Sequence, residues 1–256
     1  MNSPRVAIVT GAGSESGIGF ASASALATAG LRLVIASTTA RIEDRAATLR
    51  AAGAEVATFI GDLTSSALAD ALVAVALDAY GQVDVLVNNA GLTSVSDPEV
   101  PAPIDRTDDQ TWHATIARNL DTMFFMTRAV VPLMRAAGYG RIVNVASVSG
   151  PVVAYPGDAA YHAAKAGALG LTRSVALDTA RDGITVNAVA PGWIGTDAAS
   201  EAELAYGRAT PVGRSGTAAE VAGLVAYLTG PSAGYLTGQL IVVDGGNSIV
   251  EAHTGG

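Results

Sequence analysis

A tyrosine and a lysine spaced four residues apart are the residues in this chain best suited to acid–base chemistry. Tyr161 precedes Lys165, which is the only lysine beside fourteen arginines. On a helix, such residues share one face at about 5–6 Å, so both side chains can enter one site. The ammonium would lower the tyrosine pKa from about 10, which suits proton transfer between a carbonyl and an alcohol. Alternatively, compositional bias removed the other lysines and Lys165 survived by chance.

Two further polar residues lie where they could contact a substrate. Ser147 ends a predicted strand over 141–147 and could donate a hydrogen bond to a carbonyl, although serine at a strand end is often only a turn residue. Asn119 lies midway along a predicted helix over 112–137. Because a buried asparagine needs partners, Asn119 either braces the helix or holds a water molecule.

A glycine-rich segment follows the first predicted strand, at 6–10, and opens a helix. Glycines at such a turn let the backbone approach a pyrophosphate, whose charge faces the helix N-terminus. We therefore expect a dinucleotide to contact this segment. The expected contact residues are Gly11, Gly13, Gly17, Ile18 and Gly19.

The end of the second strand discriminates between the two nicotinamide dinucleotides. An NAD site usually has Asp or Glu here, which accepts hydrogen bonds from the ribose hydroxyls. This chain has Ser37 and Thr38, followed by Arg41. Hydroxyl donors and a guanidinium would bind a 2′-phosphate, so NADP(H) is favoured over NAD(H). The alternative is that Arg41 is an ordinary solvated residue of the following helix.

The third and fourth strands also end in polar residues, at the edge where cofactors bind in such sheets. Asp62 could instead cap a helix, and Asn88 with its neighbour could brace adjacent strands. The residues expected to contact the cofactor here are Asp62, Leu63, Asn89, Ala90 and Gly91.

Short apolar runs alternate with alanine-rich, helix-like stretches along the chain. The runs lack polar alternation, as expected of parallel strands covered on both faces. This pattern predicts one α/β domain over 1–256: a Rossmann-like, doubly wound parallel sheet of about seven strands with helices on both faces. Strands are expected at 6–10, 33–37, 55–60, 83–88, 141–147, 185–191 and 240–244, and helices at 18–29, 65–80 and 112–137. Mobile substrate-side loops are expected near 93–109 and 193–211.

Composition excludes several classes of function. The chain has 256 residues, 50% of them hydrophobic, with a net charge of −8, which argues against nucleic acid and anionic membrane surfaces. It has no cysteine, and its three histidines suggest no metal cluster. No apolar run has the roughly 18 residues of a membrane span, and no signal peptide is recognisable. We therefore expect a cytoplasmic protein.

Taken together, these motifs resemble the classical short-chain dehydrogenases/reductases. The resemblance extends over nearly the whole chain and is greatest to the branch with 3-oxoacyl-carrier-protein reductases and related secondary-alcohol dehydrogenases. The motifs that carry it, in the family's order, are Thr10-Gly11…Gly17-Ile18-Gly19, Asn88-Asn89-Ala90-Gly91, Asn119, Ser147, Tyr161…Lys165, Pro191-Gly192-Trp193-Ile194-x-Thr196 and Thr237-Gly238-Gln239…Asp244-Gly245-Gly246.

The resemblance implies a role for each site residue. Tyr161 would exchange a proton with the substrate oxygen, Lys165 would lower the tyrosine pKa and hold the nicotinamide ribose, and Ser147 would polarise the carbonyl. Asn119 would position a water in a proton relay. Four residues after the sixth strand would contact the cofactor: Pro191, Gly192, Ile194 and Thr196. The family also implies a small carbonyl or alcohol substrate and a homotetramer.

The chain departs from the family pattern in ways that affect these expectations. Five residues separate Gly11 from Gly17 where three are usual, so this loop should bulge, and Ser16 stands where many NADP-dependent members have a basic residue. Ser147 and Tyr161 are one residue further apart than is common.

His162 directly follows Tyr161, so on a helix its side chain points about 100° away from the tyrosine. This favours packing or an interface as the role of His162.

Other functions remain open from sequence. An NAD-dependent alcohol dehydrogenase or a 3-oxoacyl-carrier-protein reductase would share these motifs. A non-catalytic dinucleotide-sensing protein could share the fold, because a fold does not determine function. Such sensors tend to lose the tyrosine–lysine pair, which this chain retains.

Overall fold

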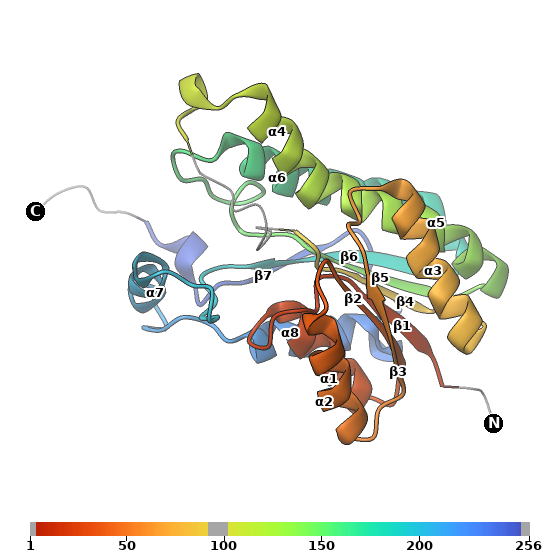
Figure 1. Cartoon of the computed structure of the whole chain (residues 1–256). Helices are drawn as coiled ribbons and strands as arrows, with labels where there is room; N and C mark the ends of the chain where they lie inside the picture. The colour runs from red at the N-terminus through yellow and green to blue at the C-terminus, as the bar shows by residue number, and fades with distance from the viewer. Residues whose placement is uncertain (1–3, 92–101, 252–256) are drawn as a thin grey trace, which may run out of the picture.

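A seven-stranded parallel sheet forms the centre of the computed structural model, which describes residues 4–91 and 102–251 (Figure 1). All seven predicted strands are confirmed, with ends displaced by one or two residues. They are β1 (Val6–Val9), β2 (Arg32–Ser37), β3 (Val56–Ile60), β4 (Val85–Asn88), β5 (Gly140–Val145), β6 (Ile184–Pro191) and β7 (Leu240–Val243).

The strand order is β3-β2-β1-β4-β5-β6-β7, and every neighbouring pair is parallel. The chain therefore winds outward from β1 in one direction and from β4 in the other. Ligands of open α/β sheets bind outside the carboxyl ends of the strands at this reversal. The predicted doubly wound fold is confirmed, and it places the glycine-rich segment and the end of β4 side by side.

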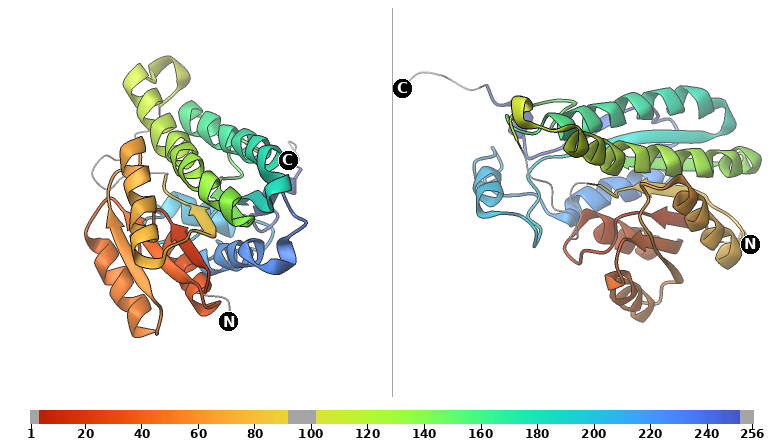
Figure 2. Two further views of the ribbon diagram at one scale, coloured as in Figure 1. Left: turned by 90° about the vertical axis from the view of Figure 1, so that its right-hand side faces the viewer. Right: turned by 45° about the horizontal axis from the view of Figure 1, so that its top comes forward.

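Helices cover both faces of the sheet (Figures 1 and 2). On the face drawn below the sheet in Figure 1 lie α1 (Ile18–Thr28), α2 (Arg41–Ala51) and α8 (Ala218–Thr229). On the opposite face lie α3 (Ser66–Tyr80), α5 (Thr122–Ala137) and α6 (Ala159–Thr179).

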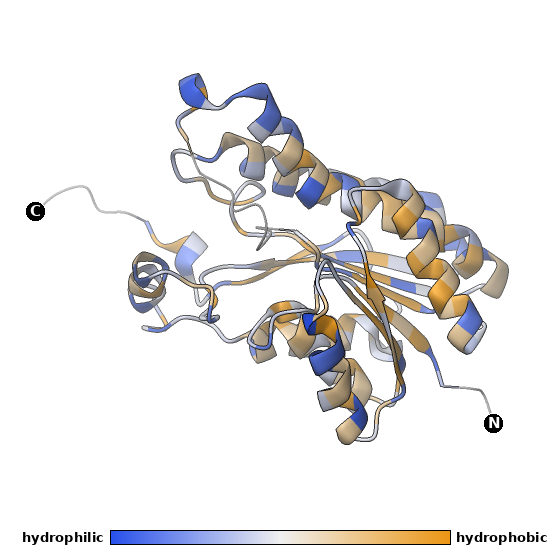
Figure 3. Cartoon of the chain, viewed as in Figure 1, coloured by the Kyte–Doolittle hydropathy of each residue, from blue (hydrophilic) through white to orange (hydrophobic). Residues whose placement is uncertain are grey.

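This two-sided cover explains why the strands read as continuous apolar runs. All four residues of β1 are buried, and successive side chains point to opposite faces. Ala7 and Val9 join the core against α1, α2 and α8, whereas Val6 and Ile8 join the core against α3 and α5. In Figure 3 much of the sheet is hydrophobic, whereas the helices carry both hydrophobic and hydrophilic residues.

The predicted helix over 112–137 is interrupted near its first third. It consists of α4 (Asp109–Ile116), a π-helical turn (Ala117–Asp121) and α5, which follow one another directly. Asp108 caps α4 by accepting the backbone N–H of Thr111 at 2.7 Å. A π turn within a helix often marks a functional site, and this one contains Asn119.

The two segments predicted as loops have different outcomes in the structure. The 193–211 segment is not a continuous loop, because it contains α7 (Glu201–Arg208), whose N-terminus has a capping box made by Ser200 and Glu203. Of the 93–109 loop, residues 93–101 lie outside the described part of the chain. Its remainder holds a 3₁₀ turn at Ile104–Arg106. Further 3₁₀ turns lie at Ala180–Asp182, Pro231–Ala233 and Asn247–Ile249.

At the amino ends of the strands, two arginines enclose a tyrosine. Arg5 and Arg141 both lie over the Tyr139 ring, with guanidinium carbons 3.7 and 4.4 Å from its centroid. Arg5 also donates a hydrogen bond to the Tyr139 hydroxyl. Burial raises the pKa of Tyr139 and lowers the pKa of Arg141. This cluster lies at the edge of the sheet away from the ligand-binding edge.

Candidate active site

Tyr161 and Lys165 lie buried on one face of α6. Asp158 caps this helix and accepts the backbone N–H of Tyr161 at 3.3 Å. Only 7% of Tyr161 and 4% of Lys165 are exposed, and the Lys165 Nζ lies 5.5 Å from the Tyr161 ring centroid. The ammonium also donates to the Val145 carbonyl at the end of β5, at 3.2 Å. A cation is thus held beside the phenol in a largely dry environment, where its effect on the phenol is strong.

Ser147 follows β5 two residues after the carbonyl that holds Lys165. Its side chain is buried, and its Oγ accepts the backbone N–H of Ser149 at 3.1 Å. This bond is typical of a turn, so the turn-residue alternative for Ser147 is observed, and its contact with a substrate carbonyl stays a prediction.

Asn119 braces the π turn against the end of β4. It is fully buried, and its Nδ2 donates to the Thr115 carbonyl at 3.1 Å. Its Oδ1 lies 2.8 Å from the position that a Cβ at Gly91 would occupy, and Leu120 lies 2.9 Å from the equivalent position at Gly167 of α6. Bracing, one of the two predicted roles, is therefore observed. The water-positioning role stays a prediction.

The glycine-rich segment packs too closely to accept side chains. A Cβ at Gly19 would clash with the Gly11 carbonyl oxygen and lie 2.5 Å from the Asn89 Nδ2. Asn89 in turn donates to the carbonyls of Thr10 and Gly11 at 3.2 and 3.0 Å. The α1 helix begins after Gly17 with no side-chain cap, so no side chain covers its first N–H groups.

Two neighbouring residues of this segment contact different parts of the chain. A turn is closed by the Gly17 N–H and the Ser14 carbonyl at 3.2 Å. From it, Glu15 forms an ion pair with Arg45 of α2 at 2.8 Å. The Oγ of Ser16 accepts the backbone N–H of Asp197, from the segment after β6, at 2.8 Å. The lengthened loop thus joins the sheet's two halves across the ligand-binding edge.

The residues predicted to choose between NADP and NAD cluster at the end of β2. Arg41 is the first residue of α2, and its Nε donates to the Thr39 hydroxyl at 3.2 Å. A Cβ at Gly13 would lie 2.9 Å from the Ser37 Oγ and 4.0 Å from a terminal nitrogen of Arg41. Arg41 therefore borders the glycine-rich segment, although the Ser37 hydroxyl is engaged by the backbone of Thr39.

The polar and apolar residues that follow β3 and β4 have different contacts. Asp62 accepts the backbone N–H and the hydroxyl of Thr64, and the cap of α3 is Ser65, so the helix-cap alternative for Asp62 is wrong. The Leu63 side chain lies in the core. The Ala90 backbone N–H donates to the Thr10 hydroxyl at 2.9 Å, which holds this strand end against the glycine-rich segment.

The segment after β6 is held by backbone pairing. The Gly192 N–H donates to the Val243 carbonyl at 3.0 Å, directly after Pro191. Ile194 forms an isolated bridge with Gly216, and Thr196 follows it. Trp193 packs on Tyr206 of α7 with ring centroids 4.9 Å apart.

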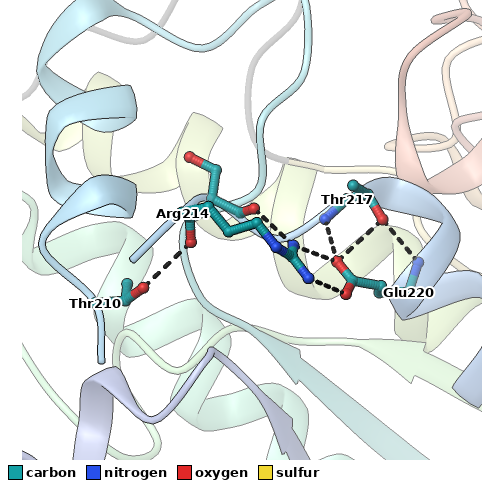
Figure 4. Close-up of polar contacts among 5 residues, drawn as sticks. Thr210, Arg214, Thr217 and Glu220 are labelled. Atoms are coloured by element: carbon teal, nitrogen blue, oxygen red, sulfur yellow. Dashed lines mark hydrogen bonds and ion pairs between the residues drawn. The ribbon is translucent and has the colours of Figure 1, made fainter. Parts of the chain in front are cut away.

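An ion pair that the sequence did not predict joins Arg214 to Glu220, at the start of α8 (Figure 4). Arg214 donates to both Glu220 carboxylate oxygens, at 2.9 and 2.7 Å. Glu220 also accepts the Thr217 N–H at 2.8 Å, completing the capping box of α8. The Arg214 guanidinium holds the pKa of Glu220 down, at about 2. The Thr217-x-x-Glu220 spacing was the readable signal for the capping box, but it does not reveal the arginine.

These features fit a dinucleotide. The glycines let this segment pack tightly against the ends of β2 and β4, the start of α1 presents backbone donors, and Arg41 borders the same segment. Among residues 4–91 and 102–251, no group of three or more acidic or histidine side chains is arranged to hold a metal ion. Within those same ranges, no helix is long and apolar enough to cross a membrane.

Comparisons with known proteins decide the family. Residues 11–248 match the family model described as "Enoyl-(Acyl carrier protein) reductase", of the short-chain dehydrogenases/reductases. This chain belongs to the short-chain dehydrogenase/reductase family. As a member of that family it is an oxidoreductase that acts on CH–OH groups and uses NAD(P)(H).

Individual short-chain dehydrogenases/reductases are similar over nearly their whole length. The 3-oxoacyl-[acyl-carrier-protein] reductase of Synechocystis sp. is 40% identical, with 94% of this chain and 96% of that protein covered. The galactitol 2-dehydrogenase (L-tagatose-forming) of Cereibacter sphaeroides is 39% identical, with 95% and 94% covered. The crystal structure of levodione reductase matches with a TM-score of 0.90 at 31% identity, with 96% and 98% covered.

Proposed function

We propose that this protein interconverts a ketone and a secondary alcohol with NADP(H), using Tyr161 as the proton donor and acceptor. The observation that carries the proposal is the buried Lys165 ammonium, held between the Tyr161 ring and the Val145 carbonyl. Burying a charge costs free energy, so an ammonium kept at a buried position beside a phenol is better explained by a function than by chance.

Each residue of the site has a part in this chemistry. When bound, the nicotinamide dinucleotide supplies or accepts the hydride. Tyr161 gives its proton to the carbonyl oxygen during reduction and takes it back during oxidation. Lys165 stabilises the phenolate that this transfer leaves, and Ser147 donates a hydrogen bond that orients the carbonyl. Asn119 holds the π turn and positions a water from which Tyr161 is reprotonated by way of Lys165.

The binding of the cofactor is divided among several strand ends. The glycine-rich segment and the start of α1 take the pyrophosphate, and Asp62, Leu63, Asn89, Ala90 and Gly91 border the adenosine half. The nicotinamide half lies against Tyr161, Lys165, Pro191, Gly192, Ile194 and Thr196. At the adenosine end, Thr38 and Arg41 bind the 2′-phosphate, supported by the proximity of Arg41 to Gly13.

A Tyr161→Phe variant tests the proton donor. We expect kcat for ketone reduction to fall by about 10² or more, the usual contribution of general acid catalysis. The measurement is NADPH oxidation with ketones of graded size. Tyr227→Phe, which alters a half-exposed tyrosine on α8, is the matched control and should keep full activity. Wild-type turnover in Tyr161→Phe would show that Tyr161 is not the proton donor. Tight cofactor binding by the wild type without turnover of any ketone would instead favour the sensing function.

Cofactor preference is tested with Arg41→Ala. Loss of the guanidinium should raise KM for NADPH by about tenfold and leave KM for NADH nearly unchanged, because only NADPH carries the 2′-phosphate. Arg50→Ala, at the far end of the same helix, is the control. A wild-type preference for NADH would show that Arg41 is a solvated surface residue.

The substrate is proposed only as far as a ketone or secondary alcohol. The relatives named above act on an acyl-carrier-protein thioester, a sugar alcohol and levodione, according to their names. These share a carbonyl or hydroxyl at the reacting carbon and differ elsewhere. The ketone panel therefore begins with small acyclic and cyclic ketones and extends to acyl thioesters.

A homotetramer is proposed for the assembly. In the described residues β7 is an edge strand, and Val242 on it is 37% exposed. Nearby apolar residues are more open, with Ile249 85% exposed and Val250 57% exposed. Such a surface is typical of association between copies. Light scattering should give four times the monomer mass, and a Val242→Asp variant should dissociate.

A further inference from the structure

The imidazole of His162 holds the segment that joins Ser147 to Tyr161. This segment, residues 150–158, folds back across the first turn of α6. The Tyr155 backbone N–H donates to the His162 Nε2 at 3.1 Å, and the Nδ1 lies 2.6 Å from the Asp158 carbonyl oxygen. The Tyr155 ring meets the imidazole edge-on, with centroids 4.5 Å apart. One side chain therefore contacts the segment at two positions.

These contacts specify the protonation state of the ring. A backbone N–H can only donate, so Nε2 must be the acceptor. A carbonyl oxygen can only accept, so Nδ1 must carry the hydrogen. Only the neutral Nδ1–H tautomer of His162 makes both bonds, because the other tautomer and the imidazolium each place a hydrogen on Nε2.

The segment has little freedom to lie elsewhere. Gly150 has a φ of +100°, and a Cβ there would clash with the His162 carbonyl oxygen. At the other end, Asp158 forms a bridge with Ala102, where the substrate-side 93–109 loop re-enters the described residues. The Tyr155 hydroxyl donates to the Asp158 carboxylate at 3.0 Å. The segment is thus held against α6 and paired with Ala102 at its end.

This segment begins and ends within three residues of Ser147 and Tyr161, the two residues proposed to contact the carbonyl. The segment exposes two large apolar side chains, Val152 at 43% and Tyr155 at 40%. These would meet the apolar body of a bulky ketone, whereas a small ketone would reach Ser147 and Tyr161 without them.

We propose that His162 is a positioning residue for bulky substrates: by accepting the Tyr155 N–H, it holds the 150–158 segment as a wall of the carbonyl site. This rests on the proposed ketone reduction. His162 touches neither the reacting oxygen nor the cofactor, so its loss changes substrate binding and leaves proton transfer intact.

Three substitutions separate hydrogen bonding from packing. His162→Gln can return an acceptor, its Oε1, near the position of Nε2. His162→Asn keeps a donor near Nδ1 but cannot reach Tyr155, and His162→Phe keeps only the ring contact. We expect Phe and Asn to raise KM for bulky ketones about three- to tenfold, the worth of one hydrogen bond, with kcat within about twofold. Gln should restore most of the loss, and KM for a small ketone should change little in any variant.

The control is His113→Phe, which alters an exposed histidine on α4 and should behave as wild type. Wild-type KM in His162→Phe with a defect in His162→Gln would show that the ring acts by packing, which overturns the proposal. If Tyr161→Phe is inactive while all His162 variants equal wild type, the proposed function stands and this inference fails. A fully active Tyr161→Phe would fail the proposed function itself.

A spectroscopic measurement needs no turnover. The chain has three histidines, so ¹⁵N-labelled imidazole signals can be assigned by their loss in His162→Phe and His113→Phe. At neutral pH, without cofactor or substrate, the His162 signals should show a protonated Nδ1 and an unprotonated Nε2. Signals of the Nε2–H tautomer or of the imidazolium would overturn the assignment.

Discussion

At the scale of single residues, the lone lysine now has a defined environment. Lys165 is buried between the Tyr161 ring and one strand-end carbonyl. This site is small and suits a compact ammonium group. The four-residue spacing was enough to predict that the two side chains share a face. The carbonyl partner could not be predicted, because it depends on how α6 packs against β5. His162 shows the same limit, since its partners come from a chain that folds back on it.

A Lys165→Arg variant therefore tests more than charge. The planar guanidinium keeps the charge but does not fit a compact ammonium site, so we expect kcat/KM to fall by about 10². Arg173→Lys, an exposed exchange on the same helix, serves as control and should be neutral. Steady-state kinetics with NADPH and one ketone measures both. Full activity in Lys165→Arg would mean that a chance survivor explains this lysine.

At the scale of elements, the sequence predicted the strands correctly, because burial between two layers of helices selects apolar residues there. All seven strands were predictable because each is a short, mostly apolar run without regular polar alternation. The π turn at Ala117–Asp121 was not predictable, since no residue type specifies it and its contacts with Gly91 and Gly167 are tertiary. The α7 helix was missed because its small residues resemble a loop, although the Ser200-x-x-Glu203 capping box was present in the sequence.

The capping box of α8 gives a pH-dependent prediction. The Arg214 hydrogen bond lowers the pKa of Glu220 from its ordinary 4.5 to about 2. Since the folded state binds this proton more weakly, the ion pair stabilises the fold above about pH 4.5. That contribution is lost as pH falls from 4.5 towards 2.

Thermal unfolding between pH 7 and pH 3 measures this effect. The unfolding midpoint of Glu220→Gln should lie below wild type at pH 7, and the difference should shrink through that window. Glu203→Gln changes the capping box of α7, which has no arginine ion pair among the described residues, and should show a weaker pH dependence. A difference that is constant with pH would contradict the assignment to the ion pair.

At the scale of the whole molecule, a chain of buried amides and hydroxyls ties the sheet to two helices. The Asn88 Nδ2 of β4 donates to the Asn144 Oδ1 of β5 at 2.9 Å and lies 3.1 Å from the Thr127 hydroxyl of α5. Asn144 donates to the Thr172 hydroxyl of α6 at 2.8 Å. The bracing predicted for Asn88 is thus observed. Its extent could not be predicted, because its members are far apart in sequence.

An Asn144→Ala variant should therefore be strongly destabilised. The free energy of unfolding should fall by about 2–4 kcal/mol, since the change leaves buried polar groups of Asn88 and Thr172 without this partner. Urea unfolding followed by circular dichroism measures the loss. Asn247→Ala, at a half-buried asparagine near the C-terminus, should stay within about 0.5 kcal/mol of wild type. Equal, small losses of unfolding free energy in Asn144→Ala and Asn247→Ala would show that the network does not stabilise the fold.

Because all strands run the same way, the arginine–tyrosine cluster formed by Arg5, Tyr139 and Arg141 lies a full strand length from the chemistry. Under the proposed function, changes at the amino edge should therefore alter heat tolerance without altering turnover. Changes in residues 150–158 should instead alter which ketones are accepted.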